Sequence, residues 1–154
     1  MIEFGELFPA HRGWTPGDRY VWLRTVRRAE EREPRYLEVF DTERRETVRR
    51  ITLEDLDGML PANVNASPHS EDVLIFSYRK PGREITDRRW WLADADGTNL
   101  RETDIKDDDR VWGWTHDGDL VIWTDKGVER LDPDTMQRRV IRDLPRPPRE
   151  TESR

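Results

Sequence analysis

Two stretches of the chain carry the same order of polar and apolar positions. Residues 63–79 (NVNASPHSEDVLIFSYR) run from a Ser-Pro turn through two acidic residues into an apolar segment, and residues 112–125 (WGWTHDGDLVIWTD) do the same from a threonine. A third stretch, TPGDRYVWLRTV, begins in the same way. The opening hydroxyl residues are separated by 52 residues (Thr15 to Ser67) and by 48 residues (Ser67 to Thr115). This spacing indicates an internal repeat, and it is close to the length of one four-stranded unit.

The second half of each repeat has a common pattern as well. Residues 35–51, 88–105 and 127–141 each read as a strand, a turn rich in Asp, Gly, Thr or Asn, and a further strand. Asp accepts hydrogen bonds from its own backbone and Gly adopts a positive φ, so these residues favour turns. Apolar positions alternate at Leu37 and Val39, which is the period of a half-buried strand.

The central segments, Val73–Phe76 and Leu120–Trp123, are apolar at every position. Strands of this kind are covered on both faces, as in the blades of a β-propeller, which pack face to face around an axis. The pattern predicts an all-β, β-propeller-like fold of three four-stranded antiparallel blade units, a half-propeller. The units span about 12–53, 62–106 and 110–144 in a single domain, 1–144.

The end of the chain has a different composition. Residues 145–154 (PRPPRETESR) are proline-rich and charged, which predicts a disordered or extended tail. Pro145 and Pro148 have the spacing of a PxxP ligand, although a plain tail is the simpler interpretation.

The order of hydroxyl-Pro-Asp-Gly, apolar strand, hairpin and D-x-D-G resembles the TolB-like propeller repeat, which has a W-S-P-D-G core. Residues 65–68 (NASP) and 114–118 (WTHDG) match that core in part, and residues 91–101 (WLADADGTNLR) match the second half. The resemblance covers about residues 12–144. It departs from the pattern where His69-Ser70 replaces Asp-Gly, where Gly17-Asp18 inverts it, and where His116 replaces Pro. Similar repeats occur in TolB and in the propellers of prolyl-oligopeptidase-like peptidases, but nothing in this chain resembles a peptidase domain.

The resemblance implies a ring of six or more blades, whereas the chain has room for three. A three-blade arc leaves apolar faces open, and such faces mark interfaces. We expect two chains to close head-to-tail into a six-bladed homodimer, because closed symmetric homo-oligomers are the commonest assemblies. The alternatives are an arc docked on a different protein, or a flatter sheet capped by the termini.

Composition and charge exclude some classes of function. Charged residues make up 39% of the 154 residues and hydrophobic residues 34%, yet seven Trp argue for a folded chain with a thin core. The formal net charge of −6 argues against non-specific nucleic-acid binding. The chain has no Cys, which excludes disulfides and thiol chemistry. It shows no signal peptide and no membrane-spanning segment, so we expect a cytoplasmic protein without a membrane partner.

Two histidines and one acidic loop are candidates for cation binding. His69 and His116 occupy matching turn positions, which places them on one rim of a propeller, but a metal site also needs nearby carboxylates. The simpler interpretation is that both face water, so no metal is predicted. Residues 104–110 (DIKDDDR) are rich in oxygen ligands suited to calcium, but they lack the glycine and the ligand spacing of a known calcium loop. A solvated loop between units is the favoured interpretation.

Tryptophans supply the remaining candidates. Trp90 and Trp91 are adjacent, so they point to opposite faces of a strand. Trp112 and Trp114 are two positions apart near a turn, which predicts that they share a face and form a surface for a ligand. With His69 and His116, they are the predicted ligand-binding residues.

Catalysis has little support in the sequence. The region around Ser67 lacks a G-x-S-x-G elbow, and no glycine-rich phosphate loop is present. The sequence therefore predicts a non-catalytic protein-interaction or scaffolding module without a cofactor. The alternative is a small ligand- or glycan-binding protein, or an enzyme, with its site in a central channel or at the Trp112/Trp114 rim.

Overall fold

The structure, a computed structural model, describes residues 12–14, 17, 19–26 and 34–147, and these residues contain strands and turns but no α-helix. The all-β prediction is therefore confirmed. The strands are β1 (Arg12–Trp14), β2 (Tyr20–Val26), β3 (Pro34–Asp41), β4 (Glu46–Thr52), β5 (Leu60–Ala66), β6 (Asp72–Arg79), β7 (Asp87–Asp94), β8 (Arg101–Glu102), β9 (Arg110–Trp114), β10 (Leu120–Thr124), β11 (Gly127–Leu131) and β12 (Arg138–Arg142).

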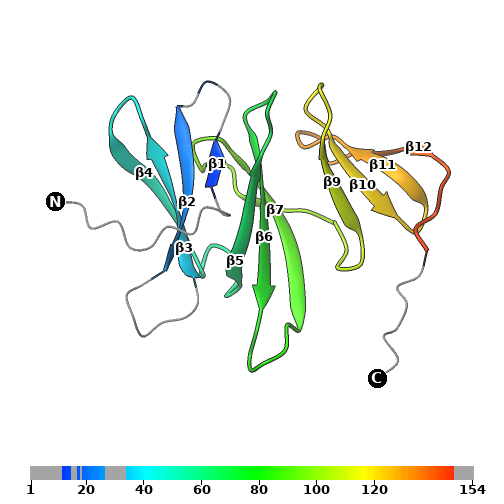
Figure 1. Cartoon of the computed structure of the whole chain (residues 1–154), viewed down its shortest axis with the longest axis horizontal. Coiled ribbons are helices and arrows are strands. Elements are labelled where there is room, and N and C mark those ends of the chain that lie inside the picture. Colours follow the sequence, from blue (N-terminus) through cyan, green and yellow to red (C-terminus); the bar gives the residue numbers. More distant parts are fainter. Residues whose placement is uncertain (1–11, 15–16, 18, 27–33, 148–154) are drawn as a thin grey trace. The chain divides into compact units, whose positions relative to one another are not determined.

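The strands form three four-stranded antiparallel sheets, each a meander in chain order (Figure 1). We call them sheet A (β1–β4), sheet B (β5–β8) and sheet C (β9–β12). The first and last residues of each sheet lie close to the boundaries of the predicted units. The polar connections between the sheets fall where the sequence pattern ends each unit. The chain divides into two compact units, residues 1–107 with sheets A and B, and residues 108–154 with sheet C. The single domain over 1–144 stays a prediction.

The hydroxyl residue that opens each repeat makes the turn that precedes the central strand. The Ser67 hydroxyl accepts hydrogen bonds from the amides of His69 and Ser70, and the Ser67 amide donates to the carbonyl of Asp72. The Thr115 hydroxyl accepts from the Asp119 amide, and the Thr115 amide donates to the Asp119 carbonyl. The two turns therefore use the same chemistry in sheets B and C. Thr15 lies outside the described residues.

The aspartates of the second half also form turns. In sheet A, the Asp41 carboxylate accepts hydrogen bonds from the amides of Glu43 and Arg44. In sheet C, the Asp132 carboxylate accepts from the amides of Asp134 and Thr135. Side-chain oxygens that bind the backbone in this way stabilise a turn without help from other elements.

Sheets A and B pack against each other and share the core of the first unit. Trp22 of β2 is fully buried, and its indole N–H donates to the Ala95 carbonyl in the β7–β8 turn at 2.9 Å. The same turn contains Gly97, which has a φ of +84° and lies directly against Val39. A Cβ at Gly97 would be 2.9 Å from the Val39 side chain, so both the turn and the packing need glycine here. The buried cluster comprises Trp22, Leu37, Val39, Ile51, Leu56, Met59, Val64, Val73, Ile75, Trp91 and Ala93.

The two adjacent tryptophans of β7 separate as predicted. Trp91 belongs to the buried cluster and donates its indole N–H to the Ser77 hydroxyl at 2.8 Å. Trp90 instead stacks with Phe76, with ring centroids 4.7 Å apart. The alternation follows from the strand geometry, which sends neighbouring side chains to opposite faces.

The second unit has its own alternation along β10 and β11. Leu120, Ile122 and Leu131 are fully buried. Val121 and Trp123 point to the other side of β10 and are half-buried. A two-residue hairpin between Thr124 and Gly127 joins the two strands.

Candidate functional site

The most exposed aromatic side chain of the described residues lies on sheet C. Trp112 has 57% of its surface exposed, and its ring lies 5.5 Å from that of Trp123 at an angle of 52°. This spacing is favourable for aromatic pairs. The Arg110 guanidinium lies over the Trp123 ring at 5.5 Å, in the geometry of a cation–π contact. We call Arg110, Trp112 and Trp123 the aromatic surface.

A β-bulge in β9 places Trp112 on this surface. The register between β9 and β10 shifts between Val121 and Ile122, so that Trp112 has no partner in the ladder. Gly113, with a φ of +143°, lies next to it and permits the distortion. The bulge turns the Trp112 side chain toward Trp123.

The prediction that Trp112 and Trp114 share a face is wrong, and the bulge is the reason. Trp114 lies opposite Leu120, which is fully buried, whereas Trp112 contacts Trp123. Leu120 and Trp123 are three positions apart on one extended strand and therefore point to opposite faces. The indole nitrogen of Trp114 is buried and finds no hydrogen-bond partner among the described residues. Only Trp112 of the predicted pair belongs to the aromatic surface.

The two histidines are exposed turn residues, each in a different compact unit. The His69 amide donates to the Ser67 hydroxyl, and His116 lies inside the turn between Thr115 and Asp119. Within the part of the chain that the structure describes, no group of three His, Asp or Glu residues has the arrangement of a metal site. The predicted ligand-binding role of His69 and His116 stays a prediction.

The acidic loop is tied to arginines. Asp107 pairs with Arg88 at 3.1 Å, and Asp108 pairs with Arg146 at 2.7 Å. Asp109 is buried and lies 3.9 Å from the Arg138 guanidinium. Arginine binds carboxylates in planar, directional pairs, which gives these aspartates a structural role within their own units.

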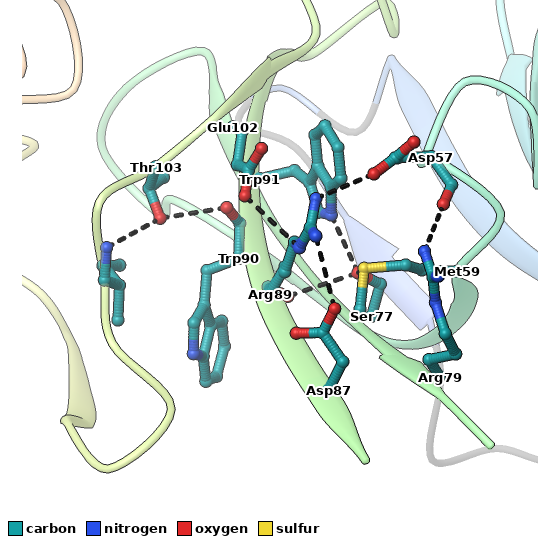
Figure 2. Close-up of polar contacts among 11 residues, drawn as sticks. Asp57, Met59, Ser77, Arg79, Asp87, Arg89, Trp90, Trp91, Glu102 and Thr103 are labelled. Carbon is teal, nitrogen blue, oxygen red and sulfur yellow. Dashed lines mark hydrogen bonds and ion pairs between the residues drawn. The ribbon is translucent and has the colours of Figure 1, made fainter. Parts of the chain in front are cut away.

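A cluster of ion pairs in the first unit surrounds Arg89 on β7 (Figure 2). Its guanidinium reaches Asp57 at 2.9 Å, Asp87 at 3.3 Å and Glu102 at 3.5 Å. Burial alone lowers the pKa of Arg89, but the three carboxylates outweigh it and the pKa is raised. The cluster ties the β4–β5 connection to β7 and β8.

Behind Arg89, the Ser77 hydroxyl connects the strands of sheet B. It receives the indole hydrogen bond of Trp91, and it lies 3.3 Å from the Arg89 carbonyl and 3.6 Å from the Met59 sulfur, as Figure 2 shows. Ser77 is fully buried. These contacts are internal to the sheet and leave Ser77 inaccessible as a nucleophile.

The last described residues of the chain bind beside the aromatic surface. The Trp123 indole N–H donates to the Leu144 carbonyl at 2.7 Å, and the Arg146 amide donates to the Thr124 carbonyl at 2.9 Å. Residues 145–147 of the predicted tail are therefore described with these contacts, and residues 148–154 lie outside the described residues. Sequence reasoning did not predict Arg110 and Leu144 as parts of the site, and for Trp123 it favoured packing over ligand binding. Alternation along β10 gives a signal for Trp123 alone, because it predicts that Trp123 and Leu120 face opposite sides.

Comparison with known proteins adds no family. Neither a scan of protein-family models nor a search of curated proteins gave a match to this chain. The resemblance to TolB-like repeats therefore stays a prediction. In the described residues, no helix has the length and apolar character needed to cross a membrane.

Proposed function

We propose that this protein is a non-catalytic protein-interaction module, and that sheet C provides its contact face. The observation that carries the proposal is the distribution of exposed apolar side chains. Of the five large hydrophobic residues exposed among the described residues, Trp112, Val140, Ile141 and Leu144 belong to the second unit, and only Ile85 belongs to the first. A unit with several exposed large apolar side chains is a stronger candidate for an interaction site than a unit with a single one.

The chemistry of this face suits a protein partner. Trp and Arg are enriched in the energetically dominant parts of interfaces, and the aromatic surface contains two Trp and one Arg. Large rigid rings also contribute contact area at little cost in side-chain entropy. Trp112 is fixed on one side by Trp123 and leaves more than half of its surface available.

For the partner we propose a second copy of the chain. Each sheet is a four-stranded antiparallel meander, the form of a propeller blade. Two copies supply six such sheets, which matches the smallest ring that the resemblance implies. In such a dimer, sheet C of each copy packs on sheet A of the other, and both open ends are closed by one type of contact. A different protein as the partner is the alternative outcome.

Light scattering coupled to size-exclusion chromatography tests this proposal. A homodimer gives twice the chain mass of 18.4 kDa at high concentration and dissociates on dilution. Trp112→Ala shifts the dissociation to higher concentration, and Ile85→Ala, an exposed apolar residue of the first unit, serves as the matched control. A wild-type protein that is monomeric at all concentrations contradicts self-association and directs the search to a different protein.

A further inference from the structure

We propose that the aromatic surface binds extended, proline-containing peptide segments, and that residues 144–147 of the chain (LPRP) occupy it as a displaceable strap. This inference rests on the proposed role as an interaction module and adds a second kind of occupant, because a peptide and a second copy of the chain would use the same surface and exclude each other. The evidence is the way in which the strap itself is bound.

The first contact has the chemistry of proline-peptide recognition. The Trp123 indole N–H donates to the Leu144 carbonyl, and Leu144 directly precedes Pro145. Proline fixes its own φ and holds the preceding residue in an extended conformation, so the carbonyl of that residue is presented at little entropic cost. Aromatic side chains with a free N–H are the usual partners of such segments. Trp112 extends the same surface beyond the strap, because its exposed ring lies 5.5 Å from that of Trp123.

The glycine at the start of β11 allows the backbone of the strap to lie close to sheet C. Gly127 begins β11 with a φ of +131°, and a Cβ at this position would collide with the Arg142 carbonyl and lie 3.2 Å from the Leu144 amide. Only glycine accommodates this close approach of backbone to backbone. The Arg146 amide then continues the contact by donating to the Thr124 carbonyl.

The strap is held by a contact that is costly to maintain. Only 5% of the Arg146 side chain is exposed, and it pairs with Asp108 at 2.7 Å. Its Nε and Nη1 atoms are buried without a hydrogen-bond partner among the described residues. A buried guanidinium with unsatisfied donors loses much of what its ion pair gains. The strap is therefore weakly held at Arg146, and a segment that binds Trp123 and Trp112 together can displace it.

The test uses the full chain and a labelled synthetic peptide with the sequence of residues 142–149 (RDLPRPPR). Arg146→Ala removes the strap's side of the ion pair with Asp108 and should release the strap, while the surface that receives the peptide keeps Asp108. Arg83→Ala, at an exposed arginine of the first unit, is the matched control. Fluorescence anisotropy of the peptide measures the affinity of each protein.

We expect Arg146→Ala to bind the peptide at least about tenfold more tightly than the wild type and Arg83→Ala, because the weakened strap no longer competes. Trp123→Phe, added to Arg146→Ala, should weaken the binding, and a peptide with alanine in place of its prolines should bind poorly. Pro145→Gly provides a second route, since it loosens the strap without changing a charge or the surface on which the peptide binds. Absence of binding to both strap-releasing variants, equal binding of the alanine peptide, or equal affinity of wild type and both strap-releasing variants would overturn the proposal. The light-scattering mass of the same samples reports self-association separately, so failure of either proposal is recognised by itself.

Discussion

Trp91 in sheet B and Trp123 in sheet C both donate an indole hydrogen bond, but to very different acceptors. Trp91 donates to the hydroxyl of a fully buried serine inside its own sheet. Trp123 donates to a backbone carbonyl of the last described segment, next to the exposed Trp112. The first contact completes a core, whereas the second uses an acceptor that lies outside the sheet.

The two hydrogen bonds differ because the sheets that carry them are covered differently. In the first unit, the apolar positions of sheets A and B meet in a shared cluster around Trp22 and Trp91. In the second unit, Leu120, Ile122 and Leu131 are buried, while the other side of the sheet keeps Trp112 exposed. An aromatic residue of these sheets is therefore a core residue or a surface residue according to what covers its side of the sheet.

The largest expected effect concerns Trp22, a fully buried aromatic residue of the first unit. Trp22→Ala removes a fully buried ring and its hydrogen bond to Ala95, and should lower the free energy of unfolding by about 3–5 kcal/mol. Trp112→Ala, on the exposed side of sheet C, should change it by no more than about 0.5 kcal/mol for the isolated chain. Urea denaturation at low protein concentration measures both. Equal losses would remove the distinction between core and surface tryptophans.

A smaller effect is expected at the β7–β8 turn of sheet B, which packs against sheet A at Val39. Gly97→Ala combines a positive φ with a close contact to Val39 and should cost about 2–3 kcal/mol of unfolding free energy. Gly58→Ala also has a positive φ, but no atom lies within 4 Å of the added Cβ, so it should cost about 1 kcal/mol. Thermal unfolding of the two variants separates packing from backbone strain. A larger loss at Gly58 would mean that the turn does not support the packing of sheet A on sheet B.

Two substitutions compare the strength of the indole hydrogen bonds of Trp91 and Trp123. Ser77→Ala leaves the buried N–H of Trp91 without its acceptor and should cost about 1–2 kcal/mol. Trp123→Phe removes a hydrogen bond at the surface, where water replaces it, and should cost less than about 1 kcal/mol. Chemical denaturation followed by circular dichroism measures both variants. A costlier Trp123→Phe would assign the strap a larger role in stability than in recognition.

The smallest effect is a pH dependence shared by the two units. Burial acts to raise the pKa of Asp41, but hydrogen bonds from the amides of Arg44 and Glu43 and from Arg19 outweigh it and lower the pKa. The amides of Thr135 and Asp134 lower the pKa of Asp132 in the same way. A lowered pKa in the folded state means that the unfolded state binds more protons, so stability is present above the usual Asp pKa of about 4 and is lost as the pH falls below it.

Asp41→Asn and Asp132→Asn should each reduce this acid-induced loss of stability, while lowering stability at neutral pH. Urea midpoints across the acid range measure the effect, with Asp125→Asn, in an exposed hairpin turn, as the control. If the control reduced the acid-induced loss as much as the other two variants, the turn hydrogen bonds would not be its source.

Much of the local structure could be predicted because it depends on short-range chemistry. The hydroxyls of Ser67 and Thr115 bind amides within four residues, and the hairpin turn at Asp132 needs only its own backbone. The sites of tertiary contact could not be predicted in the same way. A glycine within a strand, such as Gly113, is typical of a bulge, a bend or a close backbone contact, and the sequence does not show which of these applies. The bulge that forms there decides where Trp112 points.

The strap shows the same limit over a longer distance. Leu144 and Trp123 are 21 residues apart, and their contact depends on the close approach at Gly127. The composition of residues 145–154 favours an extended chain but contains no information about the surface on which that chain rests. The acidic loop is similar, since its pairing with Arg88, Arg138 and Arg146 needs side chains that are distant along the chain.

The most direct test of sheet C as the contact face is hydroxyl-radical footprinting of the tryptophans across a concentration series. The account predicts that oxidation of Trp112 decreases as the protein concentration rises, while Trp22, which is fully buried, stays protected throughout. If light scattering shows an associated state and Trp112 is oxidised equally at every concentration, the partner binds elsewhere and the central claim is contradicted.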